Sequence, residues 1–168
     1  MEYWDLYDKD RNKLNKIHLR GEEIKPGEYH IVVSGWIIDD KNRILLTQRH
    51  HQKTFPLTWE GSKGALIAGE DSFTGVLREV EEEIGIKLKG ENGHLIDTYM
   101  GHNFIKDIYV FNENVNIKDT KLQENEVIGI KWVRLCEYED MVKEGKMGPS
   151  AISDMEIIKN KYKWKNTK

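Results

Sequence analysis

The chain has 168 residues, of which 38% are hydrophobic and 33% are charged. This length is sufficient for one domain with its own hydrophobic core, without disulfides or a structural metal. The formal net charge of −3 and the pI near 6.1 argue against the basic surface that binds nucleic acids or anionic membranes. We therefore expect a single domain over residues 1–168 with a small-molecule partner, and neither nucleic acid nor membrane as a partner.

The N-terminus and the single cysteine indicate the compartment. The segment Met1–Leu6 has neither a basic region nor an apolar one of the kind found in secretory leaders, and no stretch is apolar for long enough to span a membrane. Cys136 has no second cysteine with which to form an internal disulfide, which is typical of a reducing compartment. We expect a cytoplasmic protein in which Cys136 is buried.

The first 27 residues are expected to form a β-hairpin ahead of the main body. Tyr3–Tyr7 and Leu14–Leu19 show partial alternation and are separated by the polar turn Asp8–Asn12. The turn signal Pro26-Gly27 ends this segment. Because the hairpin is rich in aromatic residues, it is also a candidate arm for a homodimer.

The main body begins with the apolar, β-branched segment Tyr29–Ile38, which is typical of a strand at the centre of a sheet. A polar turn leads to a second strand at Arg43–Arg49. The glycine-rich segment Trp59–Ala68 is expected to be strand and loop, and its glycines suggest a close approach of the backbone to a ligand. Further strands are expected at Leu95–Tyr99, Phe104–Phe111 and Val127–Val133, short helices at Glu137–Lys143 and Ile152–Tyr162, and a frayed tail at 163–168.

One segment, Asp71–Ile84, has a clear helical period. Asp71 or Ser72 can cap its start, and Gly85 can end it. Strands on both sides of this helix, with helices at the end of the chain, predict a layered α/β fold. The apolar residues that recur at helical spacing are Phe73, Val76, Leu77, Val80 and Ile84.

A second face of this helix carries Glu79, Glu82 and Glu83, spaced i, i+3 and i+4. Like charges at this spacing repel, and each pair costs a few tenths of a kcal/mol. A divalent cation such as Mg²⁺ would reverse the repulsion, because it prefers oxygen ligands and is commonly shared between carboxylates and substrate phosphates. From Glu81–Glu83 alone, a solvated acidic surface is the favoured interpretation.

The longer stretch Gly64–Ile86 changes that interpretation. It resembles the Nudix box, G-x5-E-x7-R-E-U-x-E-E-x-G-U with U an aliphatic residue, and every specified position is filled. The motif also lies in the loop-then-helix context that it requires. The resemblance implies the Nudix fold, an α/β/α sandwich with a mixed β-sheet and the Nudix loop-helix, in a single Nudix hydrolase domain.

The resemblance implies a metal site at the box. Glu79, Glu82 and Glu83 resemble the metal-binding carboxylates of the family, with Glu79 and Glu83 favoured as direct ligands. Gly64 is expected to offer its carbonyl oxygen, because no Cβ obstructs it. The expected metal is Mg²⁺, with Mn²⁺ as an alternative.

The same resemblance assigns the catalytic residues. Arg78, held by Glu70, is expected to orient the acidic face, although an ordinary surface ion pair is the alternative. A metal held there would make a bound water more acidic so that it could attack phosphorus, and one carboxylate would accept the proton. In the family this base is a glutamate of the box or of a downstream loop, and Glu124 and Glu126 are the downstream candidates unless they belong to a simple polar turn. The predicted catalytic set is Glu83, Glu79, Arg78 and Glu126.

The resemblance implies a metal-dependent hydrolase that cleaves a phosphoanhydride bond in a nucleoside diphosphate linked to another moiety. ADP-ribose, a nucleotide sugar, a dinucleotide or a modified nucleoside triphosphate are the candidate substrates. Arg49, Lys53 and Lys63 are candidates for phosphate contacts. Trp59, Tyr109 and Phe104 are candidates for stacking on a base, although core packing is favoured for each.

A looser similarity links His30–Arg49 and Lys53–Ser62 to isopentenyl-diphosphate isomerase, which shares the fold. That enzyme has a catalytic cysteine followed by His-Pro in a loop that here reads Trp59–Leu66 and contains neither. His30 matches one metal histidine of the isomerase without its partners, so we expect it to be structural. A nucleotide-sensing module without turnover is the other alternative, although such modules have usually lost glutamates of the box.

Overall fold

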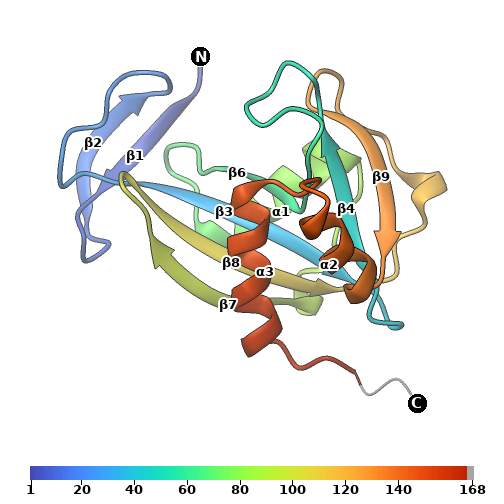
Figure 1. Ribbon diagram of the computed structural model, residues 1–168. Coiled ribbons are helices and arrows are strands. Elements are labelled where there is room, and N and C mark those ends of the chain that lie inside the picture. Colours follow the sequence, from blue (N-terminus) through green and yellow to red (C-terminus); the bar gives the residue numbers. More distant parts are fainter. Residues whose placement is uncertain (166–168) are drawn as a thin grey trace.

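The computed structural model describes residues 1–165 and has a mixed sheet between two layers of helices (Figure 1). Helix α1 (Ser72–Ile84) packs on one face of the sheet, whereas α2 (Leu135–Lys143) and α3 (Pro149–Lys161) pack on the other. The predicted α/β sandwich is therefore confirmed. Two single-turn 3₁₀ helices lie in the connections, η1 (Gly90–Asn92) and η2 (Ile117–Asp119).

The strands form a two-stranded hairpin and a seven-stranded sheet. In the larger sheet the order is β5-β4-β3-β8-β7, with β6 paired to β3 and β9 paired to β4. The predicted central strand is β3, and the other predicted strands are present with small differences at their ends. The bounds are Tyr3–Tyr7 (β1), Lys13–Leu19 (β2), His30–Ile38 (β3), Ile44–Arg49 (β4), Trp59–Glu60 (β5), Ser62–Ala65 (β6), Gly93–Met100 (β7), Phe104–Asn112 (β8) and Val127–Val133 (β9).

Strand β3 contributes to both halves of the core. Val33 and Ile37 pack toward α1, whereas Trp36 and Ile38 pack toward α2 and α3, as the alternation of side chains along a strand requires. The strand pairs in parallel with β8 along its whole length. Because helices cover both faces, a strand in this position is apolar nearly throughout, which is the pattern that the sequence shows.

Strands β3 and β4 separate soon after their turn, and this split positions the start of the box. Within the described residues they pair at Ile38 and Ile44 only. The opening is filled by β5, which pairs with β4, and by β6, which pairs with β3. Gly61 joins these two short strands, and a Cβ there would lie 2.8 Å from the ring of Trp36. The chain thereby reaches Gly64 at the centre of the sheet.

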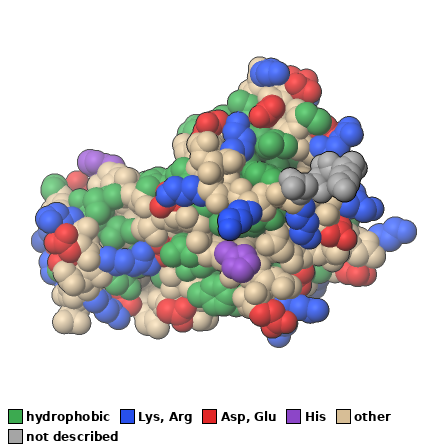
Figure 2. Space-filling model, turned by 90° about the horizontal axis from the view of Figure 1, so that it is seen from below, with side chains coloured by type: hydrophobic (Ala, Val, Ile, Leu, Met, Phe, Trp, Pro, Cys, Tyr) green, Lys and Arg blue, Asp and Glu red, His purple; other side chains and the backbone are tan. Residues whose placement is uncertain are grey.

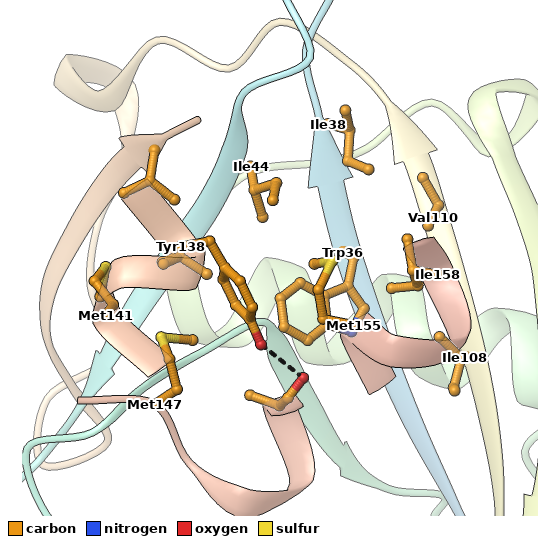
Figure 3. Packing of buried hydrophobic residues seen from close by; sticks show 13 residues of the cluster. Trp36, Ile38, Ile44, Ile108, Val110, Tyr138, Met141, Met147, Met155 and Ile158 are labelled. Carbon is orange, nitrogen blue, oxygen red and sulfur yellow. Dashed lines mark hydrogen bonds between the residues drawn. The ribbon is translucent and has the colours of Figure 1, made fainter. Parts of the chain in front are cut away.

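Trp36 is the centre of the core between the sheet and the two C-terminal helices (Figure 3). Tyr138 from α2 and Met155 from α3 pack in the same cluster. The hydroxyl of Tyr138 donates a hydrogen bond to the carbonyl oxygen of Ala151 at 3.1 Å, which joins the two helices. These contacts hold α2 and α3 as one layer.

A buried ion pair joins strand β8 to helix α3. The ammonium of Lys106 donates to both carboxylate oxygens of Asp154, at 2.6 and 2.8 Å, and to the hydroxyl of Ser150 at 2.7 Å. Lys106 is 2% and Asp154 1% exposed. Burial lowers the pKa of Lys106, and the Asp154 carboxylate opposes that shift. The indole N–H of Trp36 donates to the same carboxylate at 3.1 Å, so the pair is fully integrated into the core.

A bidentate ion pair fixes the N-terminal hairpin to the sheet. The guanidinium of Arg11 donates to both oxygens of Asp107 on β8, at 2.7 and 2.5 Å. Asp107 is 1% exposed and also accepts hydrogen bonds from the hydroxyls of Thr98 and Ser72. The hairpin is therefore attached to the sheet and to the start of α1.

Two sequence expectations concern the surface. Cys136 is exposed, so its predicted burial is wrong. It precedes the buried Tyr138 by two positions, which places it roughly 200° around α2 from that side chain. Fraying was expected for residues 163–168, of which 166–168 lie outside the described residues. The backbone N–H of Lys165 donates to the side chain of Asn42 at 3.0 Å.

The surface shown in Figure 2 carries basic and acidic side chains interspersed with apolar ones. In the described part of the chain, no helix has the length and apolar character needed to cross a membrane.

Replacing Lys106 by Met is expected to lower the free energy of unfolding by about 3–5 kcal/mol, because the Asp154 carboxylate would remain buried without its partner. Urea denaturation at neutral pH measures this loss. The double variant Lys106→Met/Asp154→Asn removes both charges and keeps an acceptor for Trp36, so it should recover most of the stability. A cost below about 1 kcal/mol for Lys106→Met alone would contradict the role of the pair.

Candidate active site

Helix α1 lies directly beneath β3 and presents its acidic face to β6. Val76 and Val80 are fully buried, and a Cβ on Gly35 of β3 would lie 3.0 Å from a methyl group of each. This close approach leaves little room for a side chain at position 35. Asp71 caps the first turn and Gly85 ends the helix in a left-handed conformation, as the sequence predicts.

The acidic face of α1 forms one wall of a cavity of about 310 Å³. Glu79, Glu82, Glu83 and Gly64, the four predicted metal ligands, all line it, and so does Glu126 from the segment ahead of β9. Its described lining has four cationic and five carboxylate side chains, a formal balance of −1. The cations are Arg20, Lys53, Lys63 and Arg78.

Arg78 holds two of these carboxylates and joins them to the loop ahead of the helix. Its Nε and Nη2 donate to the two oxygens of Glu70 at 2.8 and 2.9 Å. Nη1 donates to Glu79 at 2.8 Å and to Glu82 at 3.0 Å, and Nη2 donates to the carbonyl oxygen of Ala65 at 3.1 Å. A guanidinium has five N–H groups, so these five acceptors use all of them. Hydrogen bonding to Glu70 raises the pKa of Arg78 above its usual range.

Gly64 is the point at which β6 meets the acidic face. A Cβ at this position would lie 2.0 Å from the carboxyl carbon of Glu79, so that carboxylate occupies the space that any other residue would fill. Burial raises the pKa of Glu79, and the charge of Arg78 opposes the shift.

Glu83 lies near the same short strands, β5 and β6. Burial raises the pKa of Glu83 to about 8, against hydrogen bonds from the Ser62 side chain and the Lys63 backbone. The neighbouring carboxylates Glu60 and Glu79 add to the rise. Burial and negative neighbours thus disfavour the ionised form of Glu83, which an added cation would favour.

The oxygen atoms of Glu79, Glu82, Glu83 and Gly64 form a donor set that suits a hard divalent cation. Within the described residues, no three His, Cys, Asp or Glu side chains already stand in positions to hold a metal ion. Two of the box carboxylates, Glu79 and Glu82, instead bond to Arg78. Carboxylate oxygens next to an unobstructed backbone position are the ligands that Mg²⁺ prefers, so the residues fit the metal that the sequence predicts.

The cavity lining includes two of the three predicted phosphate contacts. Lys53 and Lys63 line the cavity. Lys53 forms an ion pair with Glu126, and Lys63 pairs with Glu60 at 2.5 Å. Arg49 instead donates to Glu60 at 2.6 Å and, in the described structure, is not part of the cavity wall.

The remaining candidates lie elsewhere. Glu124 is exposed and lies outside the described lining of the cavity, whereas Glu126 is part of that lining. Tyr109 is buried in the half of the core that faces α1, and Trp59 packs against the half that faces α2 and α3. Core packing is therefore confirmed for both. Phe104 packs edge-on against His30 at 6.5 Å.

The N-terminal hairpin supplies a further wall, which the sequence did not predict. Glu2 and Arg20 both line the cavity, and Nη1 of Arg20 donates to Glu2 at 2.8 Å. The indole N–H of Trp4 donates to the other oxygen of Glu2 at 2.7 Å, and its ring stacks on His30 at 4.1 Å. Nothing in the spacing of the box points to residues so far upstream, although Arg20 stands in the polar stretch that follows the hairpin.

A wider hollow of about 600 Å³ adjoins the charged cavity at Glu2. Met1, Tyr3, Ile67 and Ala68 form its other described walls. The charged cavity therefore has a neighbouring hollow whose walls are largely apolar.

Comparison with known proteins decides the family. The model of the NUDIX domain matches residues 28–151. The chain belongs to the Nudix hydrolase family. An uncharacterized Nudix hydrolase of Listeria monocytogenes is 31% identical over 151 residues, which cover 89% of each chain. The predicted family and the prediction of a hydrolase of that family are thereby confirmed.

Solved structures show the same fold. A Deinococcus radiodurans protein superposes with a TM-score of 0.75 at 16% identity, covering 96% of this chain and all of its own. The NUDIX domain of Shewanella oneidensis NrtR, solved with ADP ribose, gives a TM-score of 0.66 at 14% identity, covering 89% of this chain and 95% of that one. Both similarities support the Nudix arrangement of the sheet and helices.

The stability of the metal-free protein is expected to depend on pH through Glu83. Its pKa of about 8 lies above the ordinary 4.5, so between these values the folded state binds more protons than the unfolded chain. Stability should therefore fall as pH rises from about 4.5 to 8, by a few kcal/mol. Urea denaturation in EDTA across this range measures the slope. Glu83→Gln should flatten it, and parallel curves for the variant and the wild type would refute the assignment.

Gly64→Ala is expected to change the site more than the fold. The added methyl must displace the carboxylate of Glu79, which is the flexible end of a side chain, so the unfolding free energy should change by less than about 1 kcal/mol. Mg²⁺ binding, followed by calorimetry, should weaken on the order of tenfold or more. Gly90→Ala, whose Cβ would lie no closer than 3.4 Å to the ring of Phe73, serves as the matched control. Unchanged Mg²⁺ affinity in Gly64→Ala would show that the contact is irrelevant to metal binding.

Proposed function

We propose that the chain is a Mg²⁺-dependent hydrolase of a phosphoanhydride bond in a nucleoside diphosphate linked to another moiety. Mn²⁺ is an alternative metal. The observation that carries this proposal is a single cavity that is lined both by the box carboxylates and by Lys53 and Lys63. A diphosphate in this cavity would meet the metal and the ammonium groups together.

Glu79, Glu82 and Glu83, with the carbonyl oxygen of Gly64, are the groups that would hold the metal. When bound, Mg²⁺ supplies neutralisation of phosphate charge and a more acidic water. Arg78 acts on the carboxylates rather than on substrate, since its five N–H groups already have acceptors in the protein. Its role is to keep Glu79 and Glu82 in place as the charges around them change.

Glu126 is the proposed base. It lines the same cavity as the box carboxylates, and its carboxylate pairs with the ammonium of Lys53. Hydrolysis requires water to add to phosphorus while the bridging P–O bond breaks, and the proton of that water passes to a carboxylate. Lys53 and Lys63 would bind non-bridging phosphate oxygens during this step.

ADP-ribose, nucleotide sugars, dinucleotides and modified nucleoside triphosphates are the candidate substrates. The complex of the related NrtR domain with ADP ribose supports a ligand of this class. The hollow beside Glu2 is wide enough, at about 600 Å³, for the group attached to the diphosphate. Isomerase chemistry finds no support, because Cys136 is exposed on α2 and the loop Trp59–Leu66 contains no cysteine.

The direct test incubates the protein with Mg²⁺ and each candidate substrate and identifies phosphate-containing products. Turnover is expected to stop in EDTA and to return with Mg²⁺ or Mn²⁺. Glu79→Gln should lower kcat/KM by about 100-fold or more, since even the partners of metal ligands contribute 10–100-fold. The control is Glu81→Gln on the same helix, whose side chain is exposed and pairs only loosely with Lys87 at 3.7 Å. Binding without turnover of any candidate would favour a sensing module instead.

The same assay tests the base. Glu126→Gln should lower kcat and remove the acidic limb of the pH–rate profile, because the glutamine cannot accept a proton. Its Mg²⁺ affinity should match that of the wild type. An unchanged kcat would assign proton transfer to a carboxylate of the box.

A further inference from the structure

The cations of the cavity are not equally available to a substrate. All five N–H groups of Arg78 have protein acceptors. The ammonium groups of Lys53 and Lys63 pair with Glu126 and Glu60, and both lysine side chains are 26% exposed. Arg20 differs from these three, because its side chain is 57% exposed.

Arg20 also has unused donors. Within the described residues its guanidinium makes one hydrogen bond, from Nη1 to Glu2, so four of its five N–H groups have no protein acceptor. A guanidinium presents its donors as a planar fork that matches two oxygens of a phosphate, which an ammonium cannot do. Of the four cations at this cavity, Arg20 is therefore the best suited to bidentate phosphate binding.

The position of Arg20 is fixed by the attachment of the hairpin to the box. The carbonyl oxygen of Tyr3 accepts a hydrogen bond from the backbone N–H of Ala68 at 2.7 Å. The carboxylate of Asp5 accepts one from the N–H of Gly69, also at 2.7 Å. The backbone N–H of Arg20 itself donates to the carbonyl oxygen of Glu2 at 3.0 Å. The first two bonds tie β1 to the loop that precedes α1, and the third ties the residue after β2 to the residue before β1.

We infer that Arg20 is a substrate-binding residue, whose guanidinium binds phosphate oxygens of the substrate at the rim of the cavity. This inference rests on the proposed function. The NUDIX model begins at residue 28, so Arg20 and Glu2 belong to a segment outside the part of the chain that defines the family. The hairpin thereby acts as a specificity element, which favours substrates with phosphate charge extending beyond the metal-binding carboxylates.

A simpler role for Arg20 would be to neutralise Glu2, whose charge would otherwise repel a phosphate. The two roles differ in a double variant. If Arg20 only neutralises Glu2, removing both charges should restore substrate binding. If Arg20 binds phosphate, Glu2→Gln cannot compensate for its loss, and the two substitutions should not rescue each other.

The experiment measures binding of methylenediphosphonate, a diphosphate analogue that cannot be hydrolysed, by calorimetry with saturating Mg²⁺. Arg20→Ala is expected to weaken binding about tenfold or more, as for loss of a hydrogen bond to a charged group. Arg20→Lys should be intermediate, because it keeps the charge without the fork. Lys16→Ala is the matched control, since Lys16 lies on the same hairpin and pairs with Glu28 away from the cavity.

Steady-state kinetics on the substrate found for the wild type provide the second readout. Arg20→Ala should raise KM by a similar factor with kcat changed less than about threefold, because the residue binds substrate and leaves the metal site intact. Thermal unfolding verifies that each variant is folded.

The possible outcomes separate the two proposals. Wild-type affinity in Arg20→Ala, or recovery of that affinity in Arg20→Ala/Glu2→Gln, would overturn the role of Arg20 while leaving the hydrolase intact. A wild-type protein that neither binds the analogue nor hydrolyses any candidate would overturn the proposed function itself. Weak binding in both Arg20→Ala and the double variant, with unchanged Lys16→Ala, supports the inference.

Discussion

The guanidinium of Arg78 is the contact on which the geometry of the site depends. Through its five N–H groups it connects the loop residue Glu70, the β6 carbonyl of Ala65 and two carboxylates of helix α1. Except for the exposed Glu82, these groups would be costly to leave without a partner. A single planar cation therefore joins β6 to the acidic face of α1. It also offsets the repulsion between the carboxylates, which costs about a few tenths of a kcal/mol per pair.

Arg78 can make these contacts because strands β3 and β4 separate close to the start of the box. The separation of β3 from β4 admits β5 and β6, and Gly64 on β6 then lies where a Cβ would overlap the carboxylate of Glu79. Gly35 allows α1 to approach β3 in the same way from within the core. Two glycines thus leave room for α1 beside the sheet, Gly35 for the methyl groups of Val76 and Val80 and Gly64 for the carboxylate of Glu79.

Much of this arrangement follows from local sequence. The period of Val76, Val80 and the other apolar residues predicted α1 and its buried face, and the spacing of Glu79, Glu82 and Glu83 predicted that they share another face. Contacts that join distant segments had no such signal. The pairing of Lys53 with Glu126 and the position of Arg20 depend on how loops and the hairpin fold back. Cys136 shows the limit of composition, because residue type favours burial while its position on α2 exposes it.

Charge compensation links the box carboxylates to the cations of the same cavity. In the structure each cation of the cavity is bound by a carboxylate: Arg78 by Glu70, Glu79 and Glu82, and Lys53, Lys63 and Arg20 by Glu126, Glu60 and Glu2. Under the proposed function, a metal and a diphosphate enter as opposite charges and redistribute these pairs. Carboxylates gain the metal while lysines and Arg20 gain phosphate oxygens, so few charges are buried alone at any stage. Since unpaired buried charge is the costly state, a cavity with a formal balance of −1 can accept both without a large rearrangement of the sheet.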